Sequence, residues 1–312
     1  MAVWRYLEDG TLDPGFGVGG VFTHHDGAGG GDQDIGRDLM VDANDRIVVT
    51  GSSLNAAFGV SMMVWRLTPD GVLDSKLGGG GFVAYLGDDP GPGSASGNAL
   101  AQDPSGMILV AGTSTVFGPA MTIWRLRDDG GLDPEWGGTG IVAHCIPGWN
   151  GGGPQGGEGE DIAIDSQGRV VVAGRTLENS SDMAVWRYRS NGSLDTSFNK
   201  QGWITHGDFN TRVNTERAFS VAIDPCGDLL VGGLVWSFEA SFAVWRVVDD
   251  GRVDPSFGVG GVALMRDPNA AWNQTTTGVQ GIVIGPSGQV FVNGFTQPAQ
   301  GADADMAVVC IR

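Results

Sequence analysis

One short phrase recurs along this chain and constrains its fold more than any other feature. It reads MAVWRY at Met183–Tyr188 and also at Met1–Tyr6, and shorter versions centre on Trp65, Trp124 and Trp245. A last version, at 306–310, has lost its Trp and Arg. The copies recur roughly every 60 residues. A repeat that runs from end to end predicts one array of similar structural units.

Charge and hydropathy exclude several classes of partner. The formal net charge is −18 at pH 7, with a pI near 4.3, so we expect neither nucleic acid nor an anionic membrane as a partner. No run of about 18 apolar residues occurs. The chain begins directly with a repeat strand, without an apolar signal segment. The localisation therefore stays open between the cytoplasm and export by a removed signal or another route.

Each repeat contains two predicted β-hairpins. The first joins two apolar runs, strands A and B, through a turn such as Asp103–Gly106, where Asp, Pro or Ser and a final Gly are typical of a type I turn. The MAVWRY phrase is strand C, and an Asp-Gly or Asn-Gly turn connects it to strand D. Beyond each following Leu-Asp pair stands a large apolar residue that we expect in the core: Phe16, Leu77, Trp136, Phe198 and Phe257.

Four short antiparallel strands per repeat predict an all-β fold, a five-bladed β-propeller with four-stranded blades. We expect a single domain, 1–312, with repeats that start near residues 1, 62, 121, 183 and 242 and a partial repeat at 306–312. The N- and C-terminal strands would close the ring. One strand C is then surplus, and it either extends a blade or pairs with another protomer, which makes an oligomer an open alternative.

The order of motifs within the repeat resembles a known family. Val-x-Gly in strand B, Val-Trp-Arg in strand C and Asp-Gly-x-Leu-Asp-x-x-Phe-Gly afterwards are similar to the bacterial delta-60 repeat family, whose tandem repeats are treated as β-propellers. The resemblance covers essentially the whole chain. It implies the fold but no shared activity and no catalytic residues. Gly285 and Val309–Cys310 depart from the pattern.

The connections from B to C and from D to A are long and differ between repeats, whereas the two hairpin turns are short and alike. Variable connections on a repeated scaffold favour ligand binding at their face of the propeller. Their polar and aromatic residues suit a glycan, another polar small molecule or a protein segment, although they can also be merely solvated. The ligand-binding candidates are Arg37, Tyr85, Trp149, Asn150, Glu160, Asn210, Arg212, Arg217, Trp236, Trp272 and Asn273.

An enzyme at the same face is the alternative, and a structural or assembly role is a second one. The acid–base candidates would be His25, Asp26, His206, Asp208 and Glu216, with the adjacent His25 and Asp26 preferred. His24, His144 and His206 share one slot in strand D, which favours a repeated packing position over a metal site. We expect no cofactor, while Ca²⁺ in the acidic connections stays open.

Two further patterns indicate structure. Each strand-C arginine is followed by the aspartate of a Leu-Asp turn, so we predict one Arg–Asp pair per repeat: Arg5, Arg66, Arg125, Arg187 and Arg246. The strand-C tryptophans are expected to pack between blades. Cys145, Cys226 and Cys310 lie at unrelated repeat positions, which does not suggest a disulfide framework.

Overall fold

The computed structural model describes residues 1–57, 59–85, 93–115, 118–146, 156–177, 181–207, 215–236, 240–265, 276–297 and 305–311. Within these ranges the chain forms antiparallel β-sheets and no helix. Its contacts divide it into two compact units, Met1–Cys145 and Ile146–Arg312, which are described one at a time.

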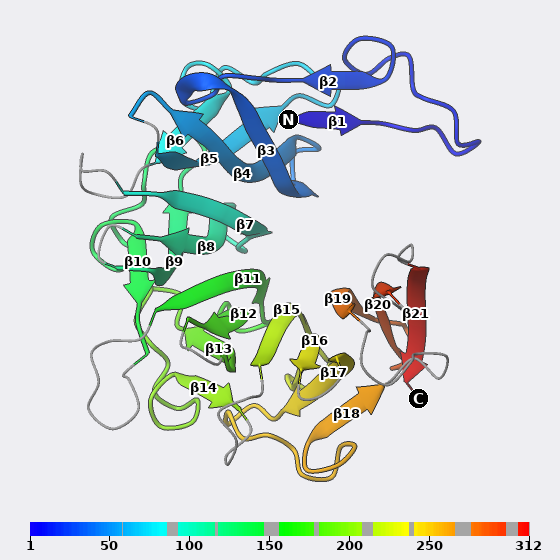
Figure 1. Ribbon diagram of the computed structural model, residues 1–312. Coiled ribbons are helices and arrows are strands. Elements are labelled where there is room, and N and C mark those ends of the chain that lie inside the picture. Colours follow the sequence, from blue (N-terminus) through cyan, green and yellow to red (C-terminus); the bar gives the residue numbers. More distant parts are fainter. Residues whose placement is uncertain are drawn as a thin grey trace. The chain divides into compact units, whose positions relative to one another are not determined.

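The described part of the first unit contains three sheets (Figure 1). One sheet pairs β1 (Ala2–Trp4) with β2 (Val21–Thr23). The second has the order β3 (Gly29–Val41), β4 (Ile47–Asn55), β5 (Val60–Leu67), β6 (Phe82–Tyr85). The third consists of β7 (Ala95–Gln102), β8 (Ile108–Ser114), β9 (Ala120–Leu126) and β10 (Ile141–His144).

The second unit continues the pattern. Its first sheet contains β11 (Gly157–Ile164), β12 (Val170–Thr176), β13 (Met183–Tyr188) and β14 (Trp203–His206). Its next sheet contains β15 (Thr215–Ile223), β16 (Leu229–Trp236), β17 (Ala240–Val247) and β18 (Val262–Met265). The last described sheet contains β19 (Thr276–Ile284), β20 (Val290–Gln297) and β21 (Asp305–Ile311).

These sheets confirm the predicted all-β fold and its A-B-C-D strand order. Four sheets contain all four strands in sequence order, β1–β2 corresponds to strands C and D, and β19–β20–β21 corresponds to A, B and C.

Strands β4 and β5 of the first unit and β16 and β17 of the second are largely apolar because neighbouring sheets of the same unit cover both of their faces. In the second unit, Val171 and Val185 of one sheet join Val231 and Trp245 of the next in one buried cluster. Four strand-C tryptophans are fully buried, which confirms their packing role: Trp65, Trp124, Trp186 and Trp245. Trp4 differs and is 56% exposed. Trp65, Trp124 and Trp245 pack against residues of the preceding sheet, whereas no described sheet of the first unit precedes β1.

The turn between strands C and D links consecutive repeats. Gly130 takes a φ of 86° there, a conformation that favours glycine, and its counterparts in the other four repeats do the same. The backbone of this turn accepts a hydrogen bond from the preceding repeat, since Gly78 N donates to Asp129 O at 2.9 Å. The preceding apolar residue, Leu77, is buried, as are Phe16, Trp136 and Phe198, whereas Phe257 is only half-buried.

Candidate functional site

Every strand A carries a one-residue β-bulge at the same position. The register against strand B shifts between Gly36 and Asp38 in β3, and equivalent shifts occur in β7, β11, β15 and β19. The residues inside the bulges differ in chemistry, and all are exposed or half-buried: Arg37, Asn98, Glu160, Phe219 and Gln280. A bulge re-aims a side chain and is common beside functional sites.

In four of the five bulged sheets, a glycine of strand B leaves room for a backbone carbonyl of the bulged segment. A Cβ added to Gly112 would lie far inside van der Waals contact with the carbonyl oxygen of Ser96, which is part of the bulged segment of β7. Gly51, Gly174 and Gly233 meet the equivalent carbonyls in the same way. The Val-x-Gly motif of the sequence is therefore the partner of the strand-A bulge.

The bulges correct one prediction from the sequence. We predicted Arg37, Glu160 and Glu216 in connections between strands D and A, but they lie within β3, β11 and β15. Trp236, predicted in a B–C connection, is the last residue of β16 and is 48% exposed. The prediction failed because these segments are polar and rich in Gly, so they lack an apolar strand pattern.

Charged residues gather on adjacent strands at the start of β11 and β15. Arg175 of β12 binds Glu158 of β11, with Nε and Nη2 at 2.8 and 2.5 Å from Oε2. Burial and the nearby Arg175 charge lower the pKa of Arg217 in β15, although Glu158 and Glu160 oppose this shift. The Arg217 Nε is buried and has no acceptor among the described residues. Arg217 is half-buried, so this part of the second unit combines a partly accessible guanidinium with the carboxylates of Glu158 and Glu160.

Two of the strand-D histidines contact a carboxylate of the next strand A. His24 Nδ1 lies 2.7 Å from Asp34 Oδ2, and His206 Nδ1 lies 2.8 Å from Glu216 Oε2. A strand-C indole is the third member of each group, with Trp65 Nε1 at 3.2 Å from His24 Nδ1. Trp245 Nε1 contacts His206 Nδ1 in the same way, at 3.3 Å. The ten-residue spacing from histidine to carboxylate is the signal of these pairs in the sequence.

The first of these groups holds a buried carboxylate in its ionised form. Burial on its own raises the pKa of Asp34, but hydrogen bonds from Ser53, His24 and the Gly27 backbone outweigh burial and lower the pKa below 3.8. The Asp34 side chain is fully buried. Its interactions join β3 to the end of β2 and to the core around Trp65.

The lowered pKa predicts an acid-sensitive contribution to stability. At neutral pH, Asp34→Asn should cost about 1.5–3 kcal/mol, the worth of hydrogen bonds to a charged group. The contribution is complete above the unfolded value of 3.8 and is lost as the pH falls through the lower folded value. Urea unfolding of both proteins, from neutral pH to about pH 2, measures it. The exposed Asp45→Asn is the control, and a pH-independent difference for Asp34→Asn would contradict the assignment.

The other candidates are dispersed or lie outside the described residues. His25 and Asp26 are exposed, and Asp26 Oδ1 accepts a hydrogen bond from Gly31 N at 2.9 Å. Tyr85 donates its hydroxyl to Gly130 O at 2.5 Å. The structure thus brings together His206 and Glu216, and places Glu160 near Arg217. The candidates outside the described residues are Trp149, Asn150, Asp208, Asn210, Arg212, Trp272 and Asn273.

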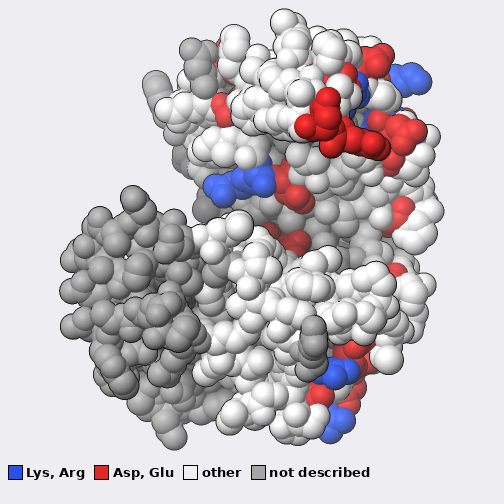
Figure 2. Space-filling model, turned by 90° about the vertical axis from the view of Figure 1, so that its right-hand side faces the viewer, with Lys and Arg blue, Asp and Glu red and all other residues white. Residues whose placement is uncertain are grey.

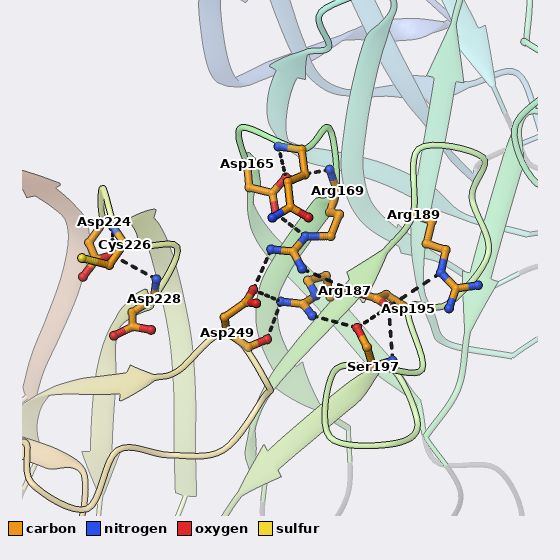
Figure 3. Close-up of polar contacts among 11 residues, drawn as sticks. Asp165, Arg169, Arg187, Arg189, Asp195, Ser197, Asp224, Cys226, Asp228 and Asp249 are labelled. Carbon is orange, nitrogen blue, oxygen red and sulfur yellow. Dashed lines mark hydrogen bonds and ion pairs between the residues drawn. The ribbon is translucent and has the colours of Figure 1, made fainter.

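Arg–Asp pairs occupy the opposite ends of strands A, at the hairpin turns. The predicted pair occurs in all five repeats, from 2.6 Å for Arg125–Asp133 to 3.7 Å for Arg246–Asp254. Figure 3 shows Asp249 in contact with both Arg169 and Arg187. Arg187 Nη1 donates to Asp249 O at 2.7 Å and to its Oδ1 at 2.8 Å.

The same network occurs in the first unit, where Arg46 and Arg66 contact Asp128 at 2.6 and 3.0 Å. In both units it joins two consecutive repeats, so we assign it a structural role.

The face in Figure 2 shows more Asp and Glu than Lys and Arg, in keeping with the acidic composition. Within the described ranges, no group of three or more His, Cys, Asp or Glu residues is placed to hold a metal ion. Over the same residues, there is no helix with the length and hydropathy needed to cross a membrane.

Similar solved structures are distant. One is a protein of unknown function from Dyadobacter fermentans DSM 18053, with 13% identity, a TM-score of 0.48 and coverage of 87% of this chain and 81% of that one. Another is an ulvan lyase of family PL25 bound to -[GlcA(1-4)Rha3S]-, with 11% identity, a TM-score of 0.49 and coverage of 89% and 68%.

A puromycin hydrolase has 14% identity and a TM-score of 0.46 over 88% of this chain, which spans only 39% of that protein. Likenesses at this level assign no activity. No match was found among curated proteins.

Two segments match a family model described as "Domain of unknown function (DUF5122) beta-propeller", residues 43–76 and 166–198. Each segment begins inside an A–B turn and extends past the Leu-Asp turn of its repeat. The two segments contain Arg46 and Arg169, so they are the repeats with the extended arginine network. These matches support a β-propeller repeat family for this chain.

Proposed function

We propose that this chain is a ligand-binding β-propeller of five blades, closed by its terminal strands and similar to the delta-60 repeats. Its ligand would be a glycan, another polar small molecule or a protein segment. The observation that carries the proposal is the bulge repeated in every strand A. The same β-bulge places an arginine, an asparagine, a glutamate, a phenylalanine and a glutamine at equivalent positions of the five strands. A constant frame with variable accessible residues is typical of binding sites on repeat proteins.

In the second unit, hydrogen bonds hold three bulged strands side by side. Asp161 Oδ2 accepts from Val221 N at 2.7 Å, and Ser220 Oγ accepts from Ile282 N at 3.1 Å. Asp161 and Ser220 each follow a bulge residue directly. The bulge residues Glu160, Phe219 and Gln280 therefore lie on adjacent strands. With Arg217 nearby, the set offers a carboxylate, an aromatic face, an amide and a guanidinium, which suits a hydroxyl-rich ligand.

The proposal predicts that two substitutions weaken binding. A glycan array and a thermal-shift screen of polar small molecules would identify a ligand. Arg217→Met and Glu160→Gln should each weaken its binding at least about tenfold, since each removes a charged hydrogen-bonding group. The control is Arg252→Met, because Arg252 is an exposed arginine in a C–D turn. Unchanged affinity in both bulge-region variants would contradict the proposal.

An acid–base enzyme is the second candidate, and the pair of His206 and Glu216 favours it. The two side chains are 22% and 4% exposed, so a buried carboxylate orients a partly accessible imidazole. Turnover of a bound ligand that disappears in His206→Gln while binding persists would establish catalysis. Assembly through the surplus strand C is a third proposal; β1 and β21 each pair with one described strand.

A further inference from the structure

A groove lies between two A–B turns of the second unit, away from the bulges. It has a volume of about 370 Å³ and lies between the turns Asp165–Arg169 and Asp224–Asp228. Figure 3 shows Asp165, Arg169 and Asp249 on one side and Asp224 with Cys226 on the other. Ser166, Ile223 and Gly227 also line the groove.

The equivalent place in the first unit is bridged by a side chain of the chain itself. Gln102, the last residue of β7, accepts a hydrogen bond from Ala43 N through Oε1 at 3.0 Å. Its Nε2 donates to Gly106 O at 3.2 Å. One carboxamide thus connects two neighbouring A–B turns by using a backbone donor of one turn and a backbone acceptor of the other.

The turns of the second unit have the same construction, but Ile223 replaces Gln102. Asp42 Oδ1 accepts from Asn44 N and Arg46 N at 2.8 and 2.9 Å, and Asp165 Oδ1 accepts from Gln167 N and Arg169 N, both at 2.8 Å. The turns at Asp103 and Asp224 agree equally well, with distances of 2.8 and 3.0 Å in both.

Ser166 N therefore corresponds to Ala43 N, and Gly227 O to Gly106 O. An isoleucine cannot bond to either group, and the described residues provide no hydrogen-bond partner for them.

We propose that this groove binds a primary carboxamide, such as a glutamine side chain of a peptide or a small free amide. The carboxamide would accept from Ser166 N–H and donate to Gly227 O, as Gln102 does in the first unit.

A carboxylate fits poorly, because Asp165, Asp224 and Asp249 line the groove. Arg169 is already bound to two of these groups, with Nε 2.5 Å from Asp165 Oδ2 and Nη2 2.6 Å from Asp249 Oδ1. Burial by itself raises the pKa of Asp249, but its bonds to Arg169 and Arg187 lower it, so Asp249 stays ionised. A neutral amide avoids this repulsion.

The chain provides matched variants for a test. Ser166→Pro removes the donor, and proline is tolerated at this turn position because Pro104 and Pro225 occupy it in the A–B turns of other repeats. Ser166→Ala keeps the N–H and is the control. Ile223→Gln supplies an internal carboxamide that competes with a ligand. Conversely, Gln102→Ile opens the same pair of groups, Ala43 N and Gly106 O, in the first unit.

The experiment is an NMR titration that follows the amide resonances of Ser166 and Ala43. The probes are a pentapeptide with a central glutamine among alanines, its methionine and glutamate analogues, and acetamide. The glutamine peptide should shift the Ser166 amide saturably and bind at least about tenfold more tightly than either analogue. Shifts with acetamide as well would identify a small amide as sufficient, whereas shifts with the peptide alone would identify a protein segment.

Ser166→Pro and Ile223→Gln should each weaken binding of the glutamine peptide at least about tenfold, as followed by the remaining groove amides. Gln102→Ile should create a second response, at Ala43. Equal shifts from the methionine peptide, or affinity unchanged in Ser166→Pro, would overturn the proposal. The groove lies apart from the bulges, so neither result tests the proposed ligand site there. That site is tested separately by Arg217→Met and Glu160→Gln.

Discussion

Gly112→Ala is expected to lower the free energy of unfolding of the first unit by about 3 kcal/mol or more. The new methyl group would overlap the carbonyl oxygen of Ser96, a backbone atom that cannot rotate away as the end of a side chain can. Relief requires the bulge of β7 to shift, which disturbs its pairing with β8. Thermal unfolding followed by circular dichroism should show a melting temperature lower by about 6–12 °C.

Gly80→Ala is the matched control for this prediction. Gly80 is exposed in the turn region before β6, and a Cβ there would meet Phe82 at an ordinary contact distance of 3.5 Å. Its effect on the melting temperature should be small. If Gly112→Ala were as stable as Gly80→Ala, the bulge would not depend on the strand-B glycine.

Arg187→Met is expected to destabilise the second unit by about 3–5 kcal/mol. Arg187 is 2% exposed, and its Nε lies 2.8 Å from Asp195 Oδ2. Burial alone raises the pKa of Asp195, but hydrogen bonds from Ser197 and the charge of Arg187 outweigh it, so the carboxylate is ionised. Without the guanidinium, this buried charge loses its main partner, and Asp249 loses its link to β13. Denaturant unfolding measures the change.

A solvent-exposed pair of similar geometry provides the control for Arg187. Arg252 Nη2 lies 2.7 Å from Asp250 Oδ2, with the two side chains 75% and 50% exposed. Arg252→Met should leave the stability almost unchanged because water screens such a pair. The double variant Arg187→Met/Asp195→Asn should recover part of the loss, because it removes a buried charge that has lost its nearest cationic partner. If the double variant were less stable than Arg187→Met, the loss would instead be due to the packing of the Arg187 side chain.

Most of the fold could be predicted from local patterns that recur in each repeat. Asp-Gly turns, the apolar strand C and the Leu-Asp aspartates each act within a few residues, so spacing was enough to predict the hairpins and the Arg–Asp pairs. The start of strand A was harder to predict. Gly29 to Arg37 contains glycines and charges in place of apolar residues, and it becomes strand because β4 pairs with it and Gly51 fits its bulge.

The sequence selected only part of the candidate site, because Asn98, Phe219 and Gln280 in the bulges were not among its candidates. Arg37, Glu160 and Arg217 were identified as polar residues between repeated strands, but their positions depend on a tertiary feature, the bulge. His25 and Asp26 are adjacent in the sequence, whereas the imidazole–carboxylate contact forms between His24 and Asp34, where β2 and β3 bring residues ten positions apart together. The groove at Ser166 depends on a difference between two repeats: Gln102 bridges the turns in one, and Ile223 occupies the equivalent position in the other. The sequence does not show that the Gln102 side chain reaches a neighbouring turn.

The Asp249 bridge has a consequence for how this chain unfolds. In a repeat array, stability is the sum of the repeats and of the couplings between neighbours. Arg187 and Arg169 strengthen the coupling between the β11–β14 and β15–β18 sheets, whereas Arg246 contacts Asp224, Asp228 and Asp254, which belong to its own sheet and the turn that follows it. In the second unit we therefore expect the β11–β14 and β15–β18 sheets to unfold together, and the β19–β21 sheet, which no described arginine bridge joins to its neighbour, to open at a lower free energy.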